Sequence, residues 1–102
     1  MIHYHVWFSL KEGVAEEDEL RKVSVFLADL KSRSLIHEYR VQRARSATPV
    51  LAPLHIVISF TDAEQFGLPF KEVAQIGIHA GMHGAMIQHV DKFVVNEFED
   101  WS

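Results

Sequence analysis

Two histidines alternate at the start of this chain of 102 residues, and a third lies in a later segment with the pattern of a β-strand. His3 and His5 fall within residues 2–10, which are rich in aromatic and β-branched residues, and His55 stands near the start of residues 54–61. An imidazole titrates near neutral pH and could act as a general acid or a general base on a small polar substrate. The spacing therefore predicts a polar site built on strands.

Further side chains extend this candidate site. Arg40 and Gln42 alternate on the polar side of residues 35–45 and could orient a carboxylate or an enolate oxygen. His79 and His83 are one helical turn apart in the segment expected to form the second helix. The candidate ligand-binding residues are His3, His5, Trp7, Arg40, Gln42, His55, His79 and His83. They either form a ligand site or line the wet interior of a dimer, and none is assigned a catalytic role.

The histidines also raise the question of a metal site. His3 and His5 on one strand, with His55 across from them, could offer three nitrogen ligands, as a tetrahedral zinc site requires. His79 and His83 have the spacing of helical metal sites, but the adjacent glutamate of the metalloprotease motif is missing. In a chain with seven histidines, alternation often produces such pairs by chance. We therefore expect no metal and no other cofactor.

The hydrophobic pattern predicts the elements that must position these residues. Strands are expected at residues 2–10, 35–45, 54–61 and 90–98, with a proline-containing loop at 46–53. The first helix should open at four acidic residues and close near Lys31 and Arg33, because these charges complement the helix dipole. Its apolar stripe consists of Leu20, Val23, Phe26, Leu27 and Leu30.

The second helix has a less regular start. Asp62 is expected to cap it, with Glu64 in the first turn. Gly67 and Pro69 then interrupt the pattern, so we expect a short kinked turn followed by a regular helix from residue 70 to about residue 89.

A β-α-β-β-α-β order within one domain, residues 1–102, predicts an α+β fold of the ferredoxin-like type, in which two helices cover one face of an antiparallel sheet. Right-handed crossovers are expected to place the first and third strands parallel and adjacent, with His5 and His55 at the same end. The other face, with Trp7 and Val57, then stays uncovered. Apolar side chains on an open face favour a partner, and the simplest partner is a second copy of the chain.

Composition excludes several classes of function. The net charge of −4 and the pI near 5.9 argue against nucleic-acid binding. The absence of cysteine excludes disulfides, thiol nucleophiles and thiolate metal sites. No apolar run reaches the roughly 18 residues of a membrane span, and the first residues do not have the pattern of a signal peptide. We therefore expect a cytoplasmic protein with no membrane partner. Phosphate-binding loops and nucleophile elbows are also missing.

Three stretches, HVWFSLKEGVAEED, LHIVISFTD and FEDW, together with a histidine-rich second helix, resemble the dimeric α+β barrel family, which is ferredoxin-like and includes the stress-responsive barrel domains. The resemblance covers nearly the whole chain and implies a homodimer with pockets. The family includes cofactor-free monooxygenases, a plant polyketide cyclase, lactone isomerases and haem-degrading enzymes, so it implies no single reaction. The strand histidines of the cyclase relative correspond to Tyr4 and Leu54 here, and no catalytic role is carried over.

These observations lead to one functional hypothesis and two alternatives. We expect a homodimer that binds a small organic molecule in a pocket lined by histidines. The first alternative is a cofactor-independent enzyme, a cyclase, isomerase or monooxygenase, acting on an aromatic or polyketide-like compound. The second is a structural or stress-related dimer without a ligand.

Overall fold

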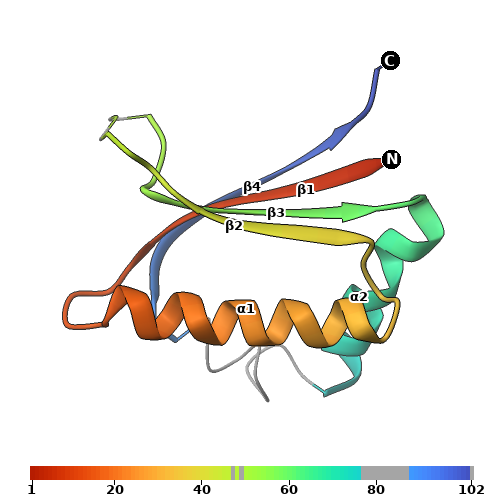
Figure 1. Ribbon diagram of the computed structural model, residues 1–102, viewed down its shortest axis with the longest axis horizontal. Coiled ribbons are helices and arrows are strands. Elements are labelled where there is room, and N and C mark those ends of the chain that lie inside the picture. The colour runs from red at the N-terminus through yellow and green to blue at the C-terminus, as the bar shows by residue number, and fades with distance from the viewer. Residues whose placement is uncertain (47, 49, 77–87, 102) are drawn as a thin grey trace.

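The computed structural model describes residues 1–46, 48, 50–76 and 88–101, and it has the expected β-α-β-β-α-β order. The elements are β1 (Ile2–Leu10), α1 (Glu16–Ser32), β2 (Glu38–Arg43), β3 (Leu54–Phe60), α2 (Ala63–Ile76) and β4 (Val90–Glu99). Figure 1 shows the sheet above α1, with the two termini at the same end. Strand β2 is shorter than the pattern predicted. His79 and His83 lie outside the described residues, so their expected place on a helix face stays a prediction.

Both helices begin where acidic residues stand. All four residues of the first turn of α1 are acidic, and Lys31 lies in its last turn. The backbone N–H of Gln65 donates to Oδ1 of Asp62 at 2.9 Å, which caps α2 as expected. The regular helix begins at Ala63 and not at residue 70 as expected, and Pro69 lies inside it. A proline has no N–H to donate, but a helix held by tertiary packing tolerates the loss of one bond.

The sheet is antiparallel throughout, with the strand order β2-β3-β1-β4. Our expectation that β1 and β3 run parallel is wrong. Because β1 and β2 each pair antiparallel with β3, they run in the same direction, and β3 lies between them in the opposite direction. In the resulting register His5 lies opposite Val57, and Trp7 lies opposite His55.

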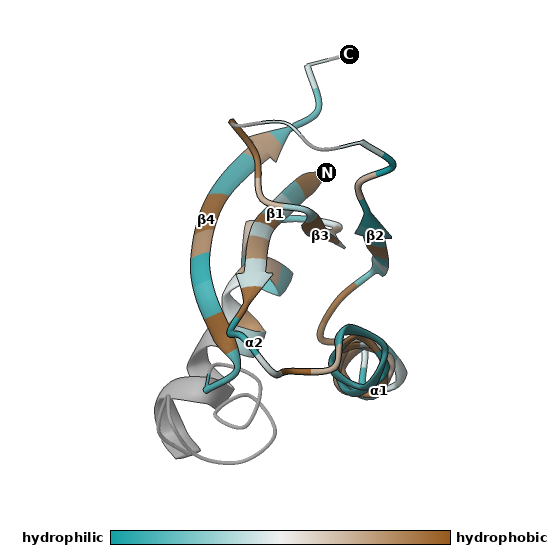
Figure 2. Cartoon of the chain, turned by 90° about the vertical axis from the view of Figure 1, so that its left-hand side faces the viewer, coloured by the Kyte–Doolittle hydropathy of each residue, from teal (hydrophilic) through white to brown (hydrophobic). Residues whose placement is uncertain are grey.

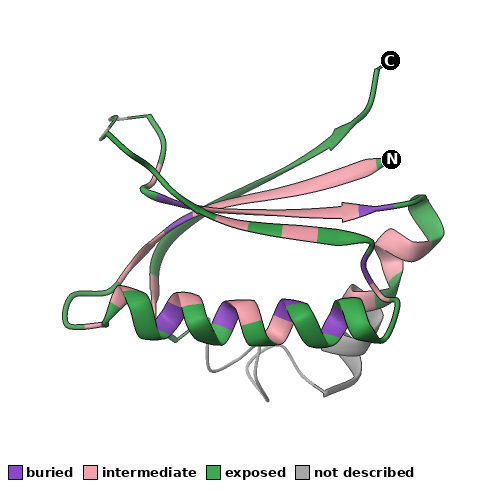
Figure 3. Cartoon of the chain, viewed as in Figure 1, coloured by how far each residue is buried: buried purple, intermediate pink, exposed green. Residues whose placement is uncertain are grey.

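The core lies between α1 and one face of the sheet. Val23, Leu27 and Leu30 of the predicted stripe are buried and form a cluster with Ile36 and Phe60. Buried segments recur along α1 in Figure 3. Partly buried apolar residues of the sheet and of both helices pack against this cluster: Ile2, Tyr4, Phe26, Leu35, Tyr39, Val41, Ile56, Ile58 and Phe66. Both helices therefore contact the same face of the sheet, as expected.

The opposite face, called the open face below, mixes polar and aromatic side chains. It is formed by the alternate residues Glu38, Arg40, Gln42, His55, Val57, Ser59, His3, His5, Trp7, Val94, Asn96 and Phe98. Hydrophobic and hydrophilic stretches follow one another along β4 in Figure 2, so both of its faces carry apolar residues. Val94 is 64% exposed and Phe98 is 45% exposed, so this face keeps large apolar side chains in water. None of the described helices is both long and apolar enough to cross a membrane.

The assignment of the core can be tested on two valines of α1. Val23 is 5% exposed and Val25 is 54% exposed, so the same substitution samples the two sides of one helix. Val23→Ala should lower the free energy of unfolding by about 2 kcal/mol relative to Val25→Ala, because only Val23 leaves a cavity and loses buried surface. The gain in helix propensity from alanine is common to both variants and cancels. Equal urea midpoints for the two variants would contradict this packing.

Candidate functional site

The register of β1 and β3 brings His5 and His55 together on the open face. Each lies diagonally across from the other, since His5 faces Val57 and Trp7 faces His55. Nδ1 of His5 is 2.8 Å from Nε2 of His55, and the ring centroids are 5.0 Å apart. The two imidazoles therefore form a hydrogen-bonded pair. The two histidines are close because they are diagonal neighbours in the antiparallel pair of β1 and β3. We expected them to be close because both would lie at the same end of two parallel strands.

Gln42 determines where the protons of this pair lie. Nδ1–H of His55 donates to Oε1 of Gln42 at 3.0 Å. In a neutral imidazole the other nitrogen carries no proton, so Nε2 of His55 accepts from Nδ1–H of His5. The same reasoning leaves Nε2 of His5 with a lone pair, and this atom has no hydrogen-bond partner in the described part of the chain. The network thus assigns one unpaired basic nitrogen to the open face.

Aromatic rings surround this nitrogen. Trp7 stacks on His55 with 4.8 Å between centroids and on His5 with 5.4 Å. Phe98 of β4 meets the ring of His5 edge-on at 4.7 Å. These rings come from three neighbouring strands, β3, β1 and β4, and together they form a surface on which another planar group can stack.

Burial keeps both imidazoles of the pair neutral. Burial lowers the pKa of His55 from its usual 6.5, and repulsion from His5 lowers it further. The pKa of His5 is lowered by burial and, second, by repulsion from His3. At neutral pH the pair therefore offers a lone pair and not a positive charge, which suits proton abstraction or acceptance of a hydrogen bond.

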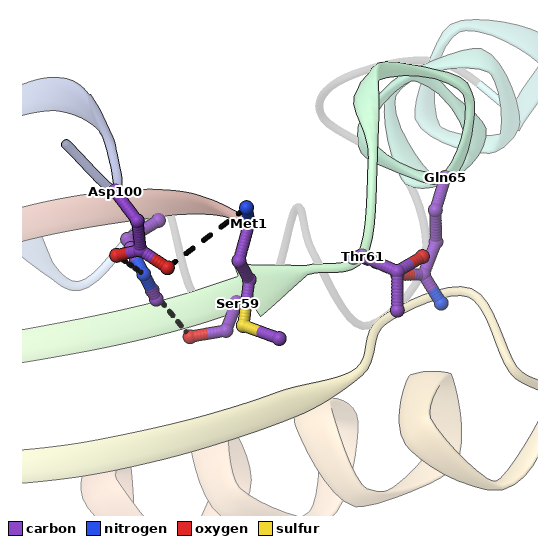
Figure 4. A network of polar contacts seen from close by, with 6 residues as sticks. Met1, Ser59, Thr61, Gln65 and Asp100 are labelled. Atoms are coloured by element: carbon purple, nitrogen blue, oxygen red, sulfur yellow. Dashed lines mark hydrogen bonds and ion pairs between the residues drawn. The ribbon is translucent and has the colours of Figure 1, made fainter. Parts of the chain in front are cut away.

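His3 belongs to a second polar cluster on the same face. Its Nδ1 is 2.8 Å from Oγ of Ser59, and its Nε2 is 2.8 Å from Oδ1 of Asp100. The amino group of Met1 lies 3.9 Å from Oδ2 of Asp100. Figure 4 shows these contacts at the end of β3, where Asp100, Met1 and Ser59 gather. His3 thus shares the open face with His5 but takes its hydrogen bonds from other residues.

The remaining candidates have different positions. Arg40 lies opposite Val57 on the open face, is exposed, and forms no hydrogen bond or ion pair within the described residues. Its guanidinium is therefore available to an anionic group. In the described ranges, 1–46, 48, 50–76 and 88–101, no three His, Asp or Glu side chains are close enough together to hold a metal ion. The combination of His3, His5 and His55 as zinc ligands does not arise in this geometry.

One functional group escaped the sequence reasoning. Glu19 is 2% exposed, and its Oε2 accepts a 2.7 Å hydrogen bond from Nδ1 of His89. Its Oε1 is buried and has no partner among the described residues. Glu19 is one of the four acidic residues at the start of α1, and it also continues the stripe of Val23 and Leu27 toward the N-terminus. That spacing was the available signal, because a side chain in register with the stripe points into the core.

Comparisons with known proteins agree with this fold. The model of DUF6614, a family of unknown function, matches residues 1–102. No curated protein matches the sequence. The Arabidopsis thaliana protein At3g17210 is similar in structure, with a TM-score of 0.73 and 14% identity over 100% of this chain and 97% of its own. A dabb family protein with a ferredoxin-like fold from Mesorhizobium loti has a TM-score of 0.67 and 16% identity, over 99% and 97%.

A hydroxynitrile lyase from Passiflora edulis is also similar, with a TM-score of 0.65 and 12% identity over 99% of this chain and 94% of the enzyme. Three other similar structures are described as dimeric proteins of unknown function with a ferredoxin-like fold, and a fourth is described as a dimeric ferredoxin-like protein. At these identities the likeness concerns the fold alone, and it confirms the ferredoxin-like architecture that the sequence predicted.

The lowered pKa values predict how stability depends on pH. Unfolded histidines take up protons as the pH falls below about 6.5, whereas the folded pair resists protonation, so the free energy of unfolding should fall with pH in this window. A double variant, His5→Gln with His55→Gln, should show a shallower decline between about pH 6.5 and 5. Urea denaturation at several pH values measures the free energy of unfolding of both proteins. An unchanged slope in the double variant would show that the pair is not held neutral.

Proposed function

The chain belongs to DUF6614, a family of unknown function, and from the geometry we propose that it is a homodimer that binds a small organic molecule in a pocket lined by the histidines of its open face. The observation that carries this proposal is the unpaired Nε2 of His5, a neutral basic nitrogen among aromatic rings. His5 is only partly buried, so a ligand hydroxyl or N–H can reach this nitrogen and donate to its lone pair.

A second copy of the chain is the proposed cover for the open face. Trp7 and Val57 lie near the middle of this face, and Val94 and Phe98 extend it along β4 with 64% and 45% of their surface exposed. Burying such side chains against a twofold-related face removes apolar surface from water without any further component. The dimeric state of several structures with this fold supports the proposal.

The chemistry of the face also favours one class of ligand. The rings of Trp7 and Phe98 suit a planar group, and Nε2 of His5 accepts a hydrogen bond from it. The exposed guanidinium of Arg40 suits a carboxylate or enolate oxygen on the same molecule. We therefore propose an aromatic compound that carries a hydroxyl group and a negative charge.

The alternative of a cofactor-independent enzyme has its own supporting observation. The lone pair on Nε2 of His5 is placed as a general base would be, and Gln42 and His55 fix the tautomer that keeps it free. The hydroxynitrile lyase shares the fold at 12% identity, so its activity is not transferred. Turnover of a bound ligand, measured by following its consumption, would separate this alternative from binding alone.

Trp7→Glu tests the dimer. We expect the wild-type protein to sediment as a dimer at micromolar concentration, with a total interface above roughly 1,200 Å². The variant should sediment as a monomer, because it places an unpaired charge in a desolvated contact. Val25→Glu is the matched control, since it puts the same charge on an exposed apolar site of α1, and it should stay dimeric. A monomeric wild-type protein would refute the dimer.

Ligand binding can be tested with 4-hydroxybenzoate, and with cyclohexanecarboxylate as the non-planar comparison. We expect 4-hydroxybenzoate to shift the indole N–H signal of Trp7 in NMR spectra in a saturable way. His5→Gln should weaken this binding by about tenfold, the value of one hydrogen bond, and change the free energy of unfolding by less than about 1 kcal/mol.

His37→Gln is the control for that experiment, because His37 is exposed and lies in the segment between α1 and β2. It should bind the probe as the wild-type protein does. If neither 4-hydroxybenzoate nor cyclohexanecarboxylate binds in a saturable way, the result would favour a structural dimer without a ligand.

A further inference from the structure

We infer that Ser59, His3 and Asp100 form a serine acyl-acceptor site, in which Ser59 is the nucleophile, His3 its general base and Asp100 a positioning residue. The site goes beyond the proposed ligand pocket and does not depend on it, because it uses neither His5 nor His55. It would take the acyl group of an ester that has a good leaving group.

The first support is that the three side chains form a continuous chain of hydrogen bonds. Oγ of Ser59 is 2.8 Å from Nδ1 of His3, and Nε2 of His3 is 2.8 Å from Oδ1 of Asp100. A nucleophile bonded to a base, and a base bonded to an orienting carboxylate, are the two geometric relations that define an activated serine. Three separate elements supply the residues: β3, β1 and the segment after β4.

The second support is the direction of these bonds. An ionised carboxylate only accepts, so Nε2–H of His3 donates to Asp100. Nδ1 of a neutral His3 is then left without a proton and accepts the hydroxyl proton of Ser59. The usual serine triad presents the opposite imidazole nitrogens, but the logic is the same: the carboxylate selects the tautomer whose free nitrogen faces the hydroxyl.

The third support is the accessibility of the cluster. In the single chain the side chain of His3 is 24% exposed and that of Asp100 is 53% exposed, and both lie at the end of the sheet where the two termini are, away from Trp7. A reagent therefore reaches the cluster from that end. The amino group of Met1 lies 3.9 Å from Oδ2 of Asp100, so both carboxylate oxygens have a partner. Figure 4 shows the contact of Met1 with Asp100 as a dashed line, with Ser59 close to Met1 in this view.

The acylation step balances without a further reactant. A lone pair on Oγ of Ser59 attacks the ester carbonyl carbon as the hydroxyl proton moves to Nδ1 of His3. The carbonyl electrons move onto oxygen and return as the bond to the leaving phenolate breaks, and His3 then loses its proton to solvent. Attack of water on the acyl-serine, with His3 again as base, restores the hydroxyl group and releases the acid.

The location of Ser59 limits the class of ester. Ser59 pairs with His3 of β1 on one side and with Glu38 of β2 on the other, so the backbone N–H groups around it belong to the sheet ladder. They are not free to stabilise a tetrahedral oxyanion. Activated aryl esters need less of that stabilisation than alkyl esters or amides do, and the site should therefore leave peptides intact.

p-Nitrophenyl acetate tests this inference on the full chain. We expect a burst of p-nitrophenolate and, by peptide mass spectrometry, one acetyl group on Ser59. Ser59→Ala should remove the acetylated peptide, and His3→Gln should slow acylation by about 100-fold, the typical contribution of a general base. Asp100→Asn should also slow it, and Asp100→Glu should restore part of the rate because a carboxylate again selects the tautomer.

Ser9→Ala is the matched control, since Ser9 follows the same alternation on β1 and faces Lys92 of β4, without a histidine opposite it. It should leave the burst unchanged. Because the acetyl group is located in the wild-type protein itself, the test does not require Ser59→Ala to fold. Acetyl groups found only on other residues, or acylation of Ser59 that is as fast in His3→Gln, would overturn the inference.

Discussion

The antiparallel pairing of β1 with β3 is the constraint on which both faces of this protein depend. Side chains alternate along each strand, so one register sends Phe8, Ile56 and Phe60 toward the helices and His5, Trp7 and His55 to the other side. A shift of one residue would exchange the faces and expose the core. The hydrophobic free energy of the core therefore also fixes the geometry of the polar face, although none of the histidines contributes to that core.

The open face can hold polar groups because they satisfy one another. Gln42, His55 and His5 form one hydrogen-bonded row, and Asp100, His3 and Ser59 form another. In each row an oxygen atom at the first residue fixes the tautomer of the neighbouring histidine. This atom is the amide oxygen of Gln42 in the first row and a carboxylate oxygen of Asp100 in the second. The first row ends at a free lone pair, whereas the second ends at a hydroxyl group. The two rows thus differ in chemistry: one is suited to accepting a proton, and the other to activating an oxygen.

The sequence predicted the features that depend on local pattern, such as the face of the sheet on which a residue lies. It did not predict the features that depend on strand pairing, such as which residues become neighbours. Alternation placed His5, His55 and Trp7 on one face correctly, because the parity of a residue does not depend on strand direction. Which residues then become neighbours depends on the register, and the assumed parallel pairing gave the wrong reason for the contact. The bond between His3 and Asp100 joins the two ends of the chain, so no local pattern could predict it. Glu19 was missed because its charge favoured the surface while its spacing favoured the core.

Dimerisation and proton binding at the histidine pair are linked in the proposed assembly. Burial already lowers the pKa of His5 and His55 in the single chain, since a charged imidazole loses hydration there. A second copy over the open face removes more water from the same rings, which lowers the pKa of both imidazoles further. Association therefore disfavours protonation, and by reciprocity protonation disfavours association to the same extent. In the proposed assembly a neutral pair therefore favours the dimer, and the unpaired nitrogen of His5 is the polar group to which we propose that a ligand donates.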